Sequence, residues 1–295
     1  MSSTRAGGGV GRAGQRPFAL IGDPVAHSPS PAMYEAAFRT LGLRARYSLA
    51  RVPAARPEAV GPTMRRLSAA GGGGNVTLPH KRAAARALDW SSPTVIRTGA
   101  CNCFWLDDRD RLAGDNTDVA GFLSAVQELA VTSLEGADIL LLGAGGAARA
   151  VLVAAAMAGA SRVDVLGRSA RRVRILIDEA GNGCGRAAEE SEARDRPYAL
   201  VVNATPLGLS PMDPLPLRLE GLRVEAVLDL VYGPDGTAWT RHAESLGLPA
   251  MDGLSMLVHQ AALSVRRWYP GAEDVAGLVS LLRESAWRSL RRGEP

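Results

Sequence analysis

The residue of this chain that most clearly suggests chemistry is a single lysine. Of the 34 lysine and arginine side chains, only Lys81 is a lysine, so the other 33 are arginines. A guanidinium stays protonated in proteins, whereas an ammonium can give up and regain a proton. A chain so rich in arginine should keep a lysine where a proton is exchanged; a chance surface lysine is the alternative. The segment Gly74-Asn-Val-Thr-Leu-Pro-His-Lys81 favours the chemical interpretation.

A glycine-rich loop follows an apolar run and precedes a helical stretch. It reads Gly143-Ala144-Gly145-Gly146-Ala147-Ala148 and matches the Gly-x-Gly-x-x-Gly/Ala dinucleotide fingerprint. The glycines allow a tight turn and let backbone N–H groups approach a pyrophosphate at the helix N-terminus. An ordinary tight turn could have the same letters, but strand, loop and helix stand in the order that the fingerprint requires. We therefore predict a dinucleotide site here.

The residues about twenty positions further on indicate which dinucleotide binds. An acidic residue there would bond the ribose 2′-hydroxyl of NAD, but Asp164 comes too early, inside an expected strand. Residues 167–169 read Gly-Arg-Ser, and two more arginines follow at 171 and 172. Arginines favour a 2′-phosphate through charge-assisted bonds, although a solvated basic helix start would look the same. We predict NADP, bound in part by Arg168, Ser169 and Arg172.

Two α/β units are expected to position these residues. The first third shows strand patterns at residues 17–22, 46–52 and 75–77, helix patterns at 31–41 and 80–88, and a hairpin at 101–114. From Asp118 the pattern changes to short apolar runs at 137–143, 162–166, 199–203 and 226–232, with helices at 119–130 and up to about 158. Such runs indicate parallel strands buried on both faces, so the second unit is predicted to be doubly wound.

The predicted fold class is therefore α/β with two domains separated by a cleft. The expected parts are a flexible tail at residues 1–15, a substrate-binding domain at 16–117, an NADP-binding Rossmann domain at 118–252 and C-terminal helices at 253–295. Helical patterns at 254–268 and up to about 288 are expected to return to the first domain.

Length and composition exclude several classes of function. With 295 residues, a net charge of +4 and 5% aromatic residues, the chain fits a two-domain globular protein. Its arginines are scattered and no basic run has interleaved aromatic residues, so we expect no nucleic-acid partner. The positive charge suits a small anionic substrate or a phosphorylated cofactor. The apolar stretch at 139–160 is interrupted by glycines and Arg149, so we expect no membrane span.

The cysteines bear on compartment and metal binding. Cys101, Cys103 and Cys184 have neither the spacing of a disulfide framework nor that of a metal site. A sparse, odd set fits a reducing cytoplasm, and we expect no metal. The first fifteen residues lack the apolar segment of a signal peptide. The oligomeric state is not determined by the sequence, and a homodimer is one option.

Five segments together resemble the shikimate dehydrogenase family. In family order they are Ile21-Gly-Asp-Pro-Val-Ala-His-Ser-Pro-Ser-Pro31; Asn75-Val-Thr-Leu-Pro-His-Lys81; Gly99-Ala-Cys-Asn102 with Gly114-Asp-Asn-Thr-Asp118; the glycine loop; and Gly253-Leu-Ser-Met-Leu-Val-His-Gln260. The resemblance implies an NADP-dependent oxidoreductase that reversibly reduces 3-dehydroshikimate to shikimate, a step of aromatic amino-acid and chorismate biosynthesis.

The resemblance also implies roles for individual residues. Lys81 matches the catalytic lysine, a general acid/base for the substrate carbonyl, and Asp118 matches the aspartate that contacts it. A helix cap is the alternative role for Asp118. Ser28 and Ser30 match the serines that bind the substrate carboxylate, with turn formation as their alternative. The other matches are Thr77, Asn102, Tyr232 and Gln260 around the substrate, and Gly143, Ala144, Gly145, Gly146, Ala147, Asn203, Thr205, Leu230 and Gly253 around the cofactor.

Three departures from the family pattern leave alternatives open. Tyr34-Glu35 stand where the family often has His-Asn, and Cys103 replaces a usual threonine, so the exact substrate could differ. Gly167 replaces a usual asparagine beside the cofactor arginine. The alternatives are a quinate or aminoshikimate dehydrogenase of the same family, with NAD as an alternative cofactor, and a non-catalytic dinucleotide sensor. A sensor would not need both Lys81 and Asp118.

Overall fold

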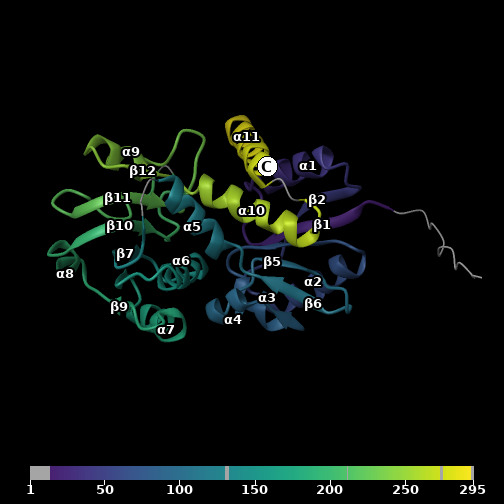
Figure 1. Ribbon diagram of the computed structural model, residues 1–295, viewed down its shortest axis with the longest axis horizontal. Helices are drawn as coiled ribbons and strands as arrows, with labels where there is room; N and C mark the ends of the chain where they lie inside the picture. Colours follow the sequence, from purple (N-terminus) through teal and green to yellow (C-terminus); the bar gives the residue numbers. More distant parts are fainter. Residues whose placement is uncertain (1–13, 130–132, 211, 273–274, 294–295) are drawn as a thin grey trace, which may run out of the picture.

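The structure, a computed structural model, contains two six-stranded sheets flanked by helices (Figure 1). It describes residues 14–129, 133–210, 212–272 and 275–293. The tail predicted at 1–15 lies outside the described residues, apart from two exposed residues that precede the first strand at Arg16. No helix within the described ranges combines the length and hydrophobicity of a membrane span.

The first sheet has the order β2-β1-β3-β5-β6-β4. β1, β2 and β3 are parallel, whereas β5 runs antiparallel to β3 and forms the predicted hairpin with β6. Its strands are β1 (Arg16–Gly22), β2 (Ala45–Arg51), β3 (Gly73–Val76), β4 (Trp90–Ser91), β5 (Cys103–Leu106) and β6 (Leu112–Asp115).

The strand predicted at residues 75–77 is displaced toward the N-terminus. β3 begins at Gly73, inside the glycine run, and Thr77 lies beyond its end. A Cβ atom at Gly74 would lie 2.1 Å from the carbonyl oxygen of Ala19 on β1. Only glycine therefore allows β1 and β3 to pack this closely, and the glycines that we expected before the strand belong to it.

The helices of this first unit are α1 (Ser30–Thr40), α2 (Val60–Ala69, preceded by the 3-10 turn η1, Pro57–Ala59), α3 (Lys81–Ala87) and α4 (Pro93–Thr98). α1 begins one residue before Pro31, a residue type favoured in the first turn, and Gly42 lies just after it with φ +65°. Its buried residues include Met33, Ala37 and Phe38, a helical spacing that turns one face to the core. Neither α2 nor α4 was predicted from the sequence.

The second sheet is fully parallel, with the order β12-β11-β10-β7-β8-β9. The chain enters at the central β7, winds outward to β9 and then returns to β10 on the other side. This reversal is the switch point at which doubly wound folds bind ligands.

The strands of this second sheet are β7 (Asp138–Leu142), β8 (Arg162–Leu166), β9 (Gly185–Ala187), β10 (Pro197–Asn203), β11 (Arg223–Asp229) and β12 (Ala250–Met251). The helices that accompany it are α6 (Gly146–Met157), α7 (Ala170–Ala180), α8 (Glu190–Arg194) and α9 (Ala238–Ser245).

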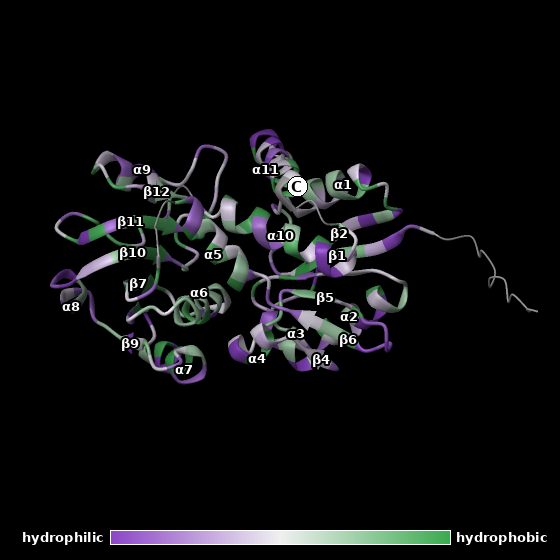
Figure 2. Cartoon of the chain, viewed as in Figure 1, coloured by the Kyte–Doolittle hydropathy of each residue, from purple (hydrophilic) through white to green (hydrophobic). Residues whose placement is uncertain are grey.

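Both faces of this sheet are buried, as the apolar runs predicted. Along β7, Ile139 and Leu141 belong to one hydrophobic cluster and Leu140 and Leu142 to another. Successive strand residues point to opposite faces, so the two clusters are the two covered sides of the sheet. Figure 2 shows the corresponding green segment in β11.

Three long helices complete the molecule (Figure 1). α5 (Asp118–Glu128) and α10 (Leu254–Trp268) pack together between the two sheets. α11 (Val275–Arg292) packs on α1 and α10. In this cluster Leu282 of α11 and Val258 of α10 join Phe18 of β1 and Met33 of α1. α5 ends at Glu128; the last residue of the helix predicted at 119–130 lies outside the described ranges.

Glu128 joins these three helices and makes the stability of the fold sensitive to pH. Its carboxylate accepts bonds from Arg283 of α11 at 2.8 Å and from Ser255 of α10, and it contacts the His259 ring at 2.8 Å. Burial alone would raise the pKa of Glu128, but the bonds from Arg283, Ser255 and His259 lower it to about 2.

We expect Glu128→Gln to lower the free energy of unfolding by about 1 kcal/mol at pH 7. A carboxylate whose pKa is depressed in the folded state stabilises above its unfolded pKa and loses that effect as pH falls toward the folded value. The difference between wild type and variant should therefore shrink below about pH 4.5, the ordinary value. Urea unfolding at pH 7 and pH 4 measures the free energy of unfolding of both proteins. A difference between wild type and Glu128→Gln that grows on acidification contradicts the prediction.

Candidate active site

The predicted substrate residues lie at one edge of the first sheet. β1 and β3 are parallel, so the loops after their carboxyl ends, which carry Ser28, Ser30, Thr77 and Lys81, emerge together. Because β5 is antiparallel to β3, its first residue pairs with Asn75 near the same edge, which places the preceding Asn102 there. β6 ends opposite that residue and leads to α5.

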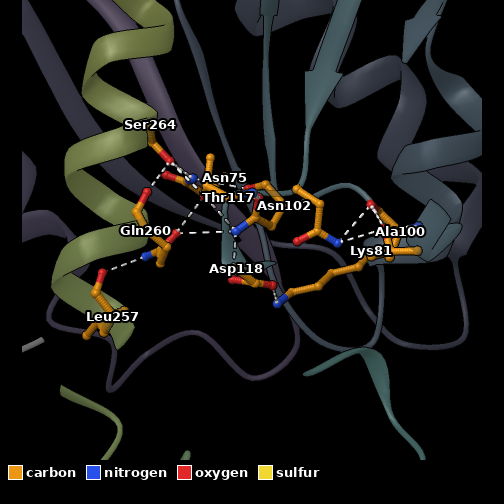
Figure 3. Close-up of polar contacts among 11 residues, drawn as sticks. Asn75, Lys81, Ala100, Asn102, Thr117, Asp118, Leu257, Gln260 and Ser264 are labelled. Atoms are coloured by element: carbon orange, nitrogen blue, oxygen red, sulfur yellow. Dashed lines mark hydrogen bonds and ion pairs between the residues drawn. The ribbon is translucent and has the colours of Figure 1, made fainter. Parts of the chain in front are cut away.

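Lys81 and Asp118 point toward each other in Figure 3. The Nζ of Lys81 lies 2.6 Å from Oδ2 of Asp118, and the two side chains are 15% and 7% exposed. Each residue is the first of its helix, α3 and α5 respectively. Asp118 does not use its carboxylate as the helix cap considered above, because Oδ2 binds Lys81 and Oδ1 accepts from Asn102 at 2.7 Å.

Asn102 holds Asp118 in place. The side chain of Asn102 is buried, and its Oδ1 accepts a hydrogen bond from the backbone N–H of Thr117 at 2.8 Å. Its Nδ2 donates to Asp118 and also lies 3.0 Å from Oγ1 of Thr117 and 3.3 Å from Oε1 of Gln260. Gln260, on α10, donates in turn to the carbonyl of Leu257. The predicted residues Asn102, Asp118 and Gln260 therefore form one bonded group (Figure 3).

A further polar layer lies behind this group. Asn75 donates to Oγ of Ser264 at 2.9 Å and to the carbonyl of Asn102 at 3.1 Å, and it accepts from the hydroxyl of Tyr47 at 2.9 Å. No role was predicted from the sequence for Tyr47, Asn75, Thr117 or Ser264. Asn75 and Thr117 stand inside the quoted motifs, which is a usable signal, whereas Tyr47 and Ser264 join only through tertiary contacts.

The two predicted carboxylate-binding serines contact each other. Ser28 Oγ donates to Ser30 Oγ at 3.0 Å and accepts from the backbone N–H of Ser30 at 3.3 Å. This second bond belongs to a turn, so Ser28 also serves the alternative role considered above. Thr77 lies half-buried, with its backbone N–H bonded to the carbonyl of Ile21 at the end of β1.

The departures Tyr34 and Glu35 have structural partners. The Tyr34 ring stacks on Tyr47 with 4.3 Å between ring centroids, and Oε1 of Glu35 accepts from the backbone N–H of Tyr47 at 2.7 Å. Both residues thus secure the strand that supplies Tyr47 to the polar layer. The second departure from the family pattern, Cys103, is fully buried in the core.

The glycine loop lies at the carboxyl edge of the second sheet. Gly143 has φ +106°, and a Cβ there would lie 2.8 Å from the carbonyl oxygen of Ala204. A side chain is therefore excluded at Gly143. Gly145 precedes α6, and a Cβ added to it would meet nothing within 4 Å. Ala144 and Ala147 are half-buried beside it. The loop therefore leaves open space before the helix N-terminus, where backbone N–H groups attract anions.

The edges of the two sheets meet at the lysine. A Cβ added to Gly146, the first residue of α6, would lie 3.5 Å from Cδ of Lys81. The side chain of Lys81 thus runs from α3 past the start of α6 toward Asp118. The structure brings the predicted proton donor and the predicted dinucleotide loop into one place.

The loops after β10, β11 and β12 form the rest of this edge. The buried Asn203 uses its whole side chain internally: Nδ2 donates to Asp229 at 2.7 Å and to the carbonyl of Leu207, and Oδ1 accepts from Thr205. Leu230 donates its N–H to the Asn203 carbonyl. Gly253 packs so closely that a Cβ would lie 2.3 Å from the Leu230 carbonyl oxygen. These residues shape the loops.

The predicted 2′-phosphate residues stand at the start of α7. Arg168 and Arg172 are exposed, and Ser169 Oγ caps the helix by accepting from the Arg172 N–H at 3.4 Å. A Cβ at the preceding Gly167 would lie 2.7 Å from Cγ2 of Val173. The glycine that departs from the family pattern is thus explained by close packing and leaves the arginines in place.

Tyr232 follows β11, and burial with the nearby charge of Asp252 raises its pKa to about 12. Its hydroxyl therefore stays protonated at neutral pH and can donate a hydrogen bond. The pKa of Asp252 is raised as well, mainly by burial.

The described residues contain no group of side chains with the arrangement of a metal site. Cys101, Cys103 and Cys184 are free and buried.

Residues 20–104 match the family model described as the shikimate dehydrogenase substrate binding domain. The chain is 35% identical to a shikimate dehydrogenase (NADP(+)) of Geobacillus kaustophilus over 93% of this chain and 100% of the relative. It is 41% identical to one of Thermus thermophilus over 91% and 98%.

Solved structures of the same group share the fold. A shikimate 5-dehydrogenase from Thermus thermophilus, in complex with NADP(H) and shikimate, has a TM-score of 0.78 at 40% identity and covers 91% of this chain and 99% of its own. A shikimate dehydrogenase from Aquifex aeolicus has a TM-score of 0.81 at 28% identity and covers 96% and 99%.

We expect Asn102→Ala to lower the free energy of unfolding by about 2 kcal/mol, because it leaves the buried Thr117 N–H and Asp118 Oδ1 without their partner. Ser28→Ala, which removes a hydroxyl from a half-buried turn, is the control and should change it by less than about 0.5 kcal/mol. Urea unfolding at pH 7 compares the two. Equal midpoints for Asn102→Ala and wild type would show that the group is not a stabilising network.

Proposed function

The chain belongs to the shikimate dehydrogenase family, and we propose that it reversibly reduces 3-dehydroshikimate to shikimate with NADPH. It is thus an NADP-dependent oxidoreductase acting on a secondary alcohol and its ketone. The relatives that carry this activity in their names match nearly the whole length of the chain.

The observation that supports this function best is the Lys81–Asp118 pair, whose lysine side chain passes the first residue of α6. A ketone becomes an alkoxide when hydride adds to it, and a neighbouring ammonium can stabilise that charge and supply the proton. The lone lysine of the chain lies beside the glycine loop and 2.6 Å from a carboxylate. A dinucleotide sensor has no use for such a pair.

We assign the proton transfer to the Nζ of Lys81. During reduction Lys81 donates a hydrogen bond to the carbonyl oxygen and then gives it a proton; during oxidation it takes that proton back. Asp118 holds the ammonium by its Oδ2 and is itself oriented by Asn102 through Oδ1. We assign contacts with substrate hydroxyls to Gln260 and the half-buried Thr77, and to Asn102 where a substrate hydroxyl replaces its 3.3 Å contact with Gln260.

The remaining substrate contacts are assigned to hydroxyl groups. The Oγ atoms of Ser28 and Ser30 lie 3.0 Å apart at the same sheet edge. When a carboxylate binds there, both hydroxyls can turn to donate to it. Tyr232, whose hydroxyl keeps its proton, would donate to the same group from the second sheet. The first sheet with its helices would therefore bind the substrate, which is supported by the family match at residues 20–104.

The residues present fit NADP. When bound, the nicotinamide supplies the hydride. Gly143 makes the close turn and Gly145 leaves space before α6 for the pyrophosphate, and Arg168 and Arg172 are exposed where a 2′-phosphate would be bound. Asn203 and Thr205, with Leu230 and Gly253, would shape the nicotinamide side of the site. We further propose a cytoplasmic location, supported by three free cysteines; a homodimer stays a prediction.

We expect both Lys81→Ala and Lys81→Arg to lower kcat by at least about 10²-fold, because neither side chain can donate the proton. NADPH binding, followed by its fluorescence, should stay within a few-fold of wild type. Arg86→Gln, which alters an exposed residue of the same helix, is the control. Near wild-type turnover of Lys81→Ala would exclude the lysine as the proton donor.

The same assay separates the related activities. Wild-type protein is given shikimate or quinate, each with NADP and with NAD, and the absorbance of the reduced cofactor is followed. We expect the highest kcat/KM with shikimate and NADP. A higher kcat/KM with quinate would identify the chain as a quinate dehydrogenase of the same family. No turnover of either substrate would favour the non-catalytic dinucleotide sensor.

The cofactor preference provides a separate prediction. Arg168→Gln and Arg172→Gln should each lower kcat/KM for NADPH by about tenfold, since a charge-assisted bond to the 2′-phosphate is worth about that factor. The value for NADH, which lacks this phosphate, should not change. Arg174→Gln, further along α7, is the control. An equal loss with NADPH and NADH would contradict the assignment.

A further inference from the structure

Arg149 joins the two units of the molecule. It lies in the first turn of α6, three residues after Gly146, and it is only 4% exposed. Its Nη1 donates to the carbonyl of Thr98, the last residue of α4, at 3.2 Å, and its Nη2 binds Glu179 of α7. The carbonyl end of a helix carries partial negative charge, so a guanidinium there is stabilised. A buried cation thus connects the dinucleotide helix to the first unit.

From Thr98 the connection continues toward the catalytic aspartate. Nδ2 of Asn116 donates to Oγ1 of Thr98 and to the carbonyl of Ala100, both at 3.0 Å. Asn116 stands two residues before Asp118, in the loop that leads from β6 into α5. Figure 3 shows Ala100 beside the Lys81 group. Two hydrogen bonds, from Arg149 to Thr98 and from Asn116 to Thr98, therefore connect Arg149 to the loop that ends at Asp118.

A second connection reaches the catalytic lysine. Glu179, which binds Arg149, lies 3.2 Å from Nη2 of Arg82. Arg82 directly follows Lys81 on α3, whereas Glu179 belongs to α7 in the second unit. Burial alone would raise the pKa of Glu179, but Arg149 and Arg82 lower it below its ordinary value. The carboxylate thus stays charged and bridges two arginines.

Both connections start at dinucleotide helices. α6 begins at Gly146 of the glycine loop, and α7 begins just after Arg168 and Ser169. We propose that Arg149, Glu179 and Arg82 form a latch that couples the seating of the dinucleotide to the alignment of Lys81 with Asp118. The proposal rests on the function proposed above and adds three positioning residues, none of which touches the reacting atoms.

The burial of Arg149 explains why the latch responds to a single change. Removing the partner of a buried charge is far more costly than removing an exposed pair, because the remaining charge is left without compensation. Glu179→Gln removes the negative charge that faces both Arg149 and Arg82, and the single amide oxygen that remains is a weaker, neutral acceptor. The contact between α6 and α4 should then weaken, and a dinucleotide would bind without aligning the lysine.

The experiment measures binding synergy in the full-length chain. NADPH is titrated, by its fluorescence, without shikimate and with saturating shikimate; this pair cannot react because both are reduced. We expect NADPH to bind more tightly in the presence of shikimate, and Glu179→Gln to reduce this ratio of Kd values by about fivefold or more. The Kd for NADPH alone should change less than the ratio.

Matched variants separate a latch from a general loss of structure. Asp178→Asn removes the same charge from the neighbouring exposed position of α7 and should keep the wild-type ratio. Arg82→Gln, at a half-exposed side chain, leaves the fold intact and should lower the ratio. Adding Arg82→Gln to Glu179→Gln should have little further effect, because the ion pair between Arg82 and Glu179 is already lost in the single variant.

The ratios of Kd values distinguish the latch from the proposed function. A wild-type ratio in both Glu179→Gln and Arg82→Gln overturns the latch, and so does a wild-type protein that binds both ligands without synergy; the proposed function then stands. A wild-type protein that binds neither ligand overturns the proposed function itself.

Discussion

The structure depends on keeping one ammonium partly buried and aligned. Lys81 begins α3, where the partial positive charge of the helix N-terminus opposes a cation, and its side chain has lost most of its contact with water. Asp118 offsets both effects at 2.6 Å, and it can do so only because Asn102 and the start of α5 hold its other oxygen in place. The rest of the fold can be understood as the means of bringing these three residues together beside a dinucleotide loop.

The sheet topology accomplishes this by collecting strand ends. In the first sheet the carboxyl ends of β1, β3 and β6 and the start of β5 coincide, which gathers residues far apart in the chain. In the second sheet the carboxyl ends of β7, β8, β10, β11 and β12 coincide because all strands are parallel. α5 and α10 pack together between the sheets, so the two edges meet, and Lys81 lies against Gly146 where they do.

The sequence predicted what local chemistry determines. The glycine loop between strand and helix, the apolar runs of the parallel sheet and the lone lysine each have a short-range signal, and the α/β fold class with a doubly wound sheet followed from them. The residues that support the site have no such signal. Ser264 meets Asn75 across 189 positions of the chain, and Tyr47 joins only because β2 lies beside β1. α4 was missed because its six residues are too few to show a helical period. The start of β3 was misplaced because a glycine run usually indicates a loop, whereas here close packing against β1 requires it.

The distribution of basic residues follows from the same constraint. A scaffold that must hold one exchangeable proton is best built from cations that cannot exchange theirs. Arginine supplies these contacts: Arg283 bridges to Glu128, Arg267 binds the buried Asp115, and Arg149 is itself buried between the units. The planar guanidinium can bond two partners at once, which a lysine in the same place could do less well. Lysine thus stands at the one described position where we propose that a proton leaves the cation, and arginine serves at the contacts where the charge stays.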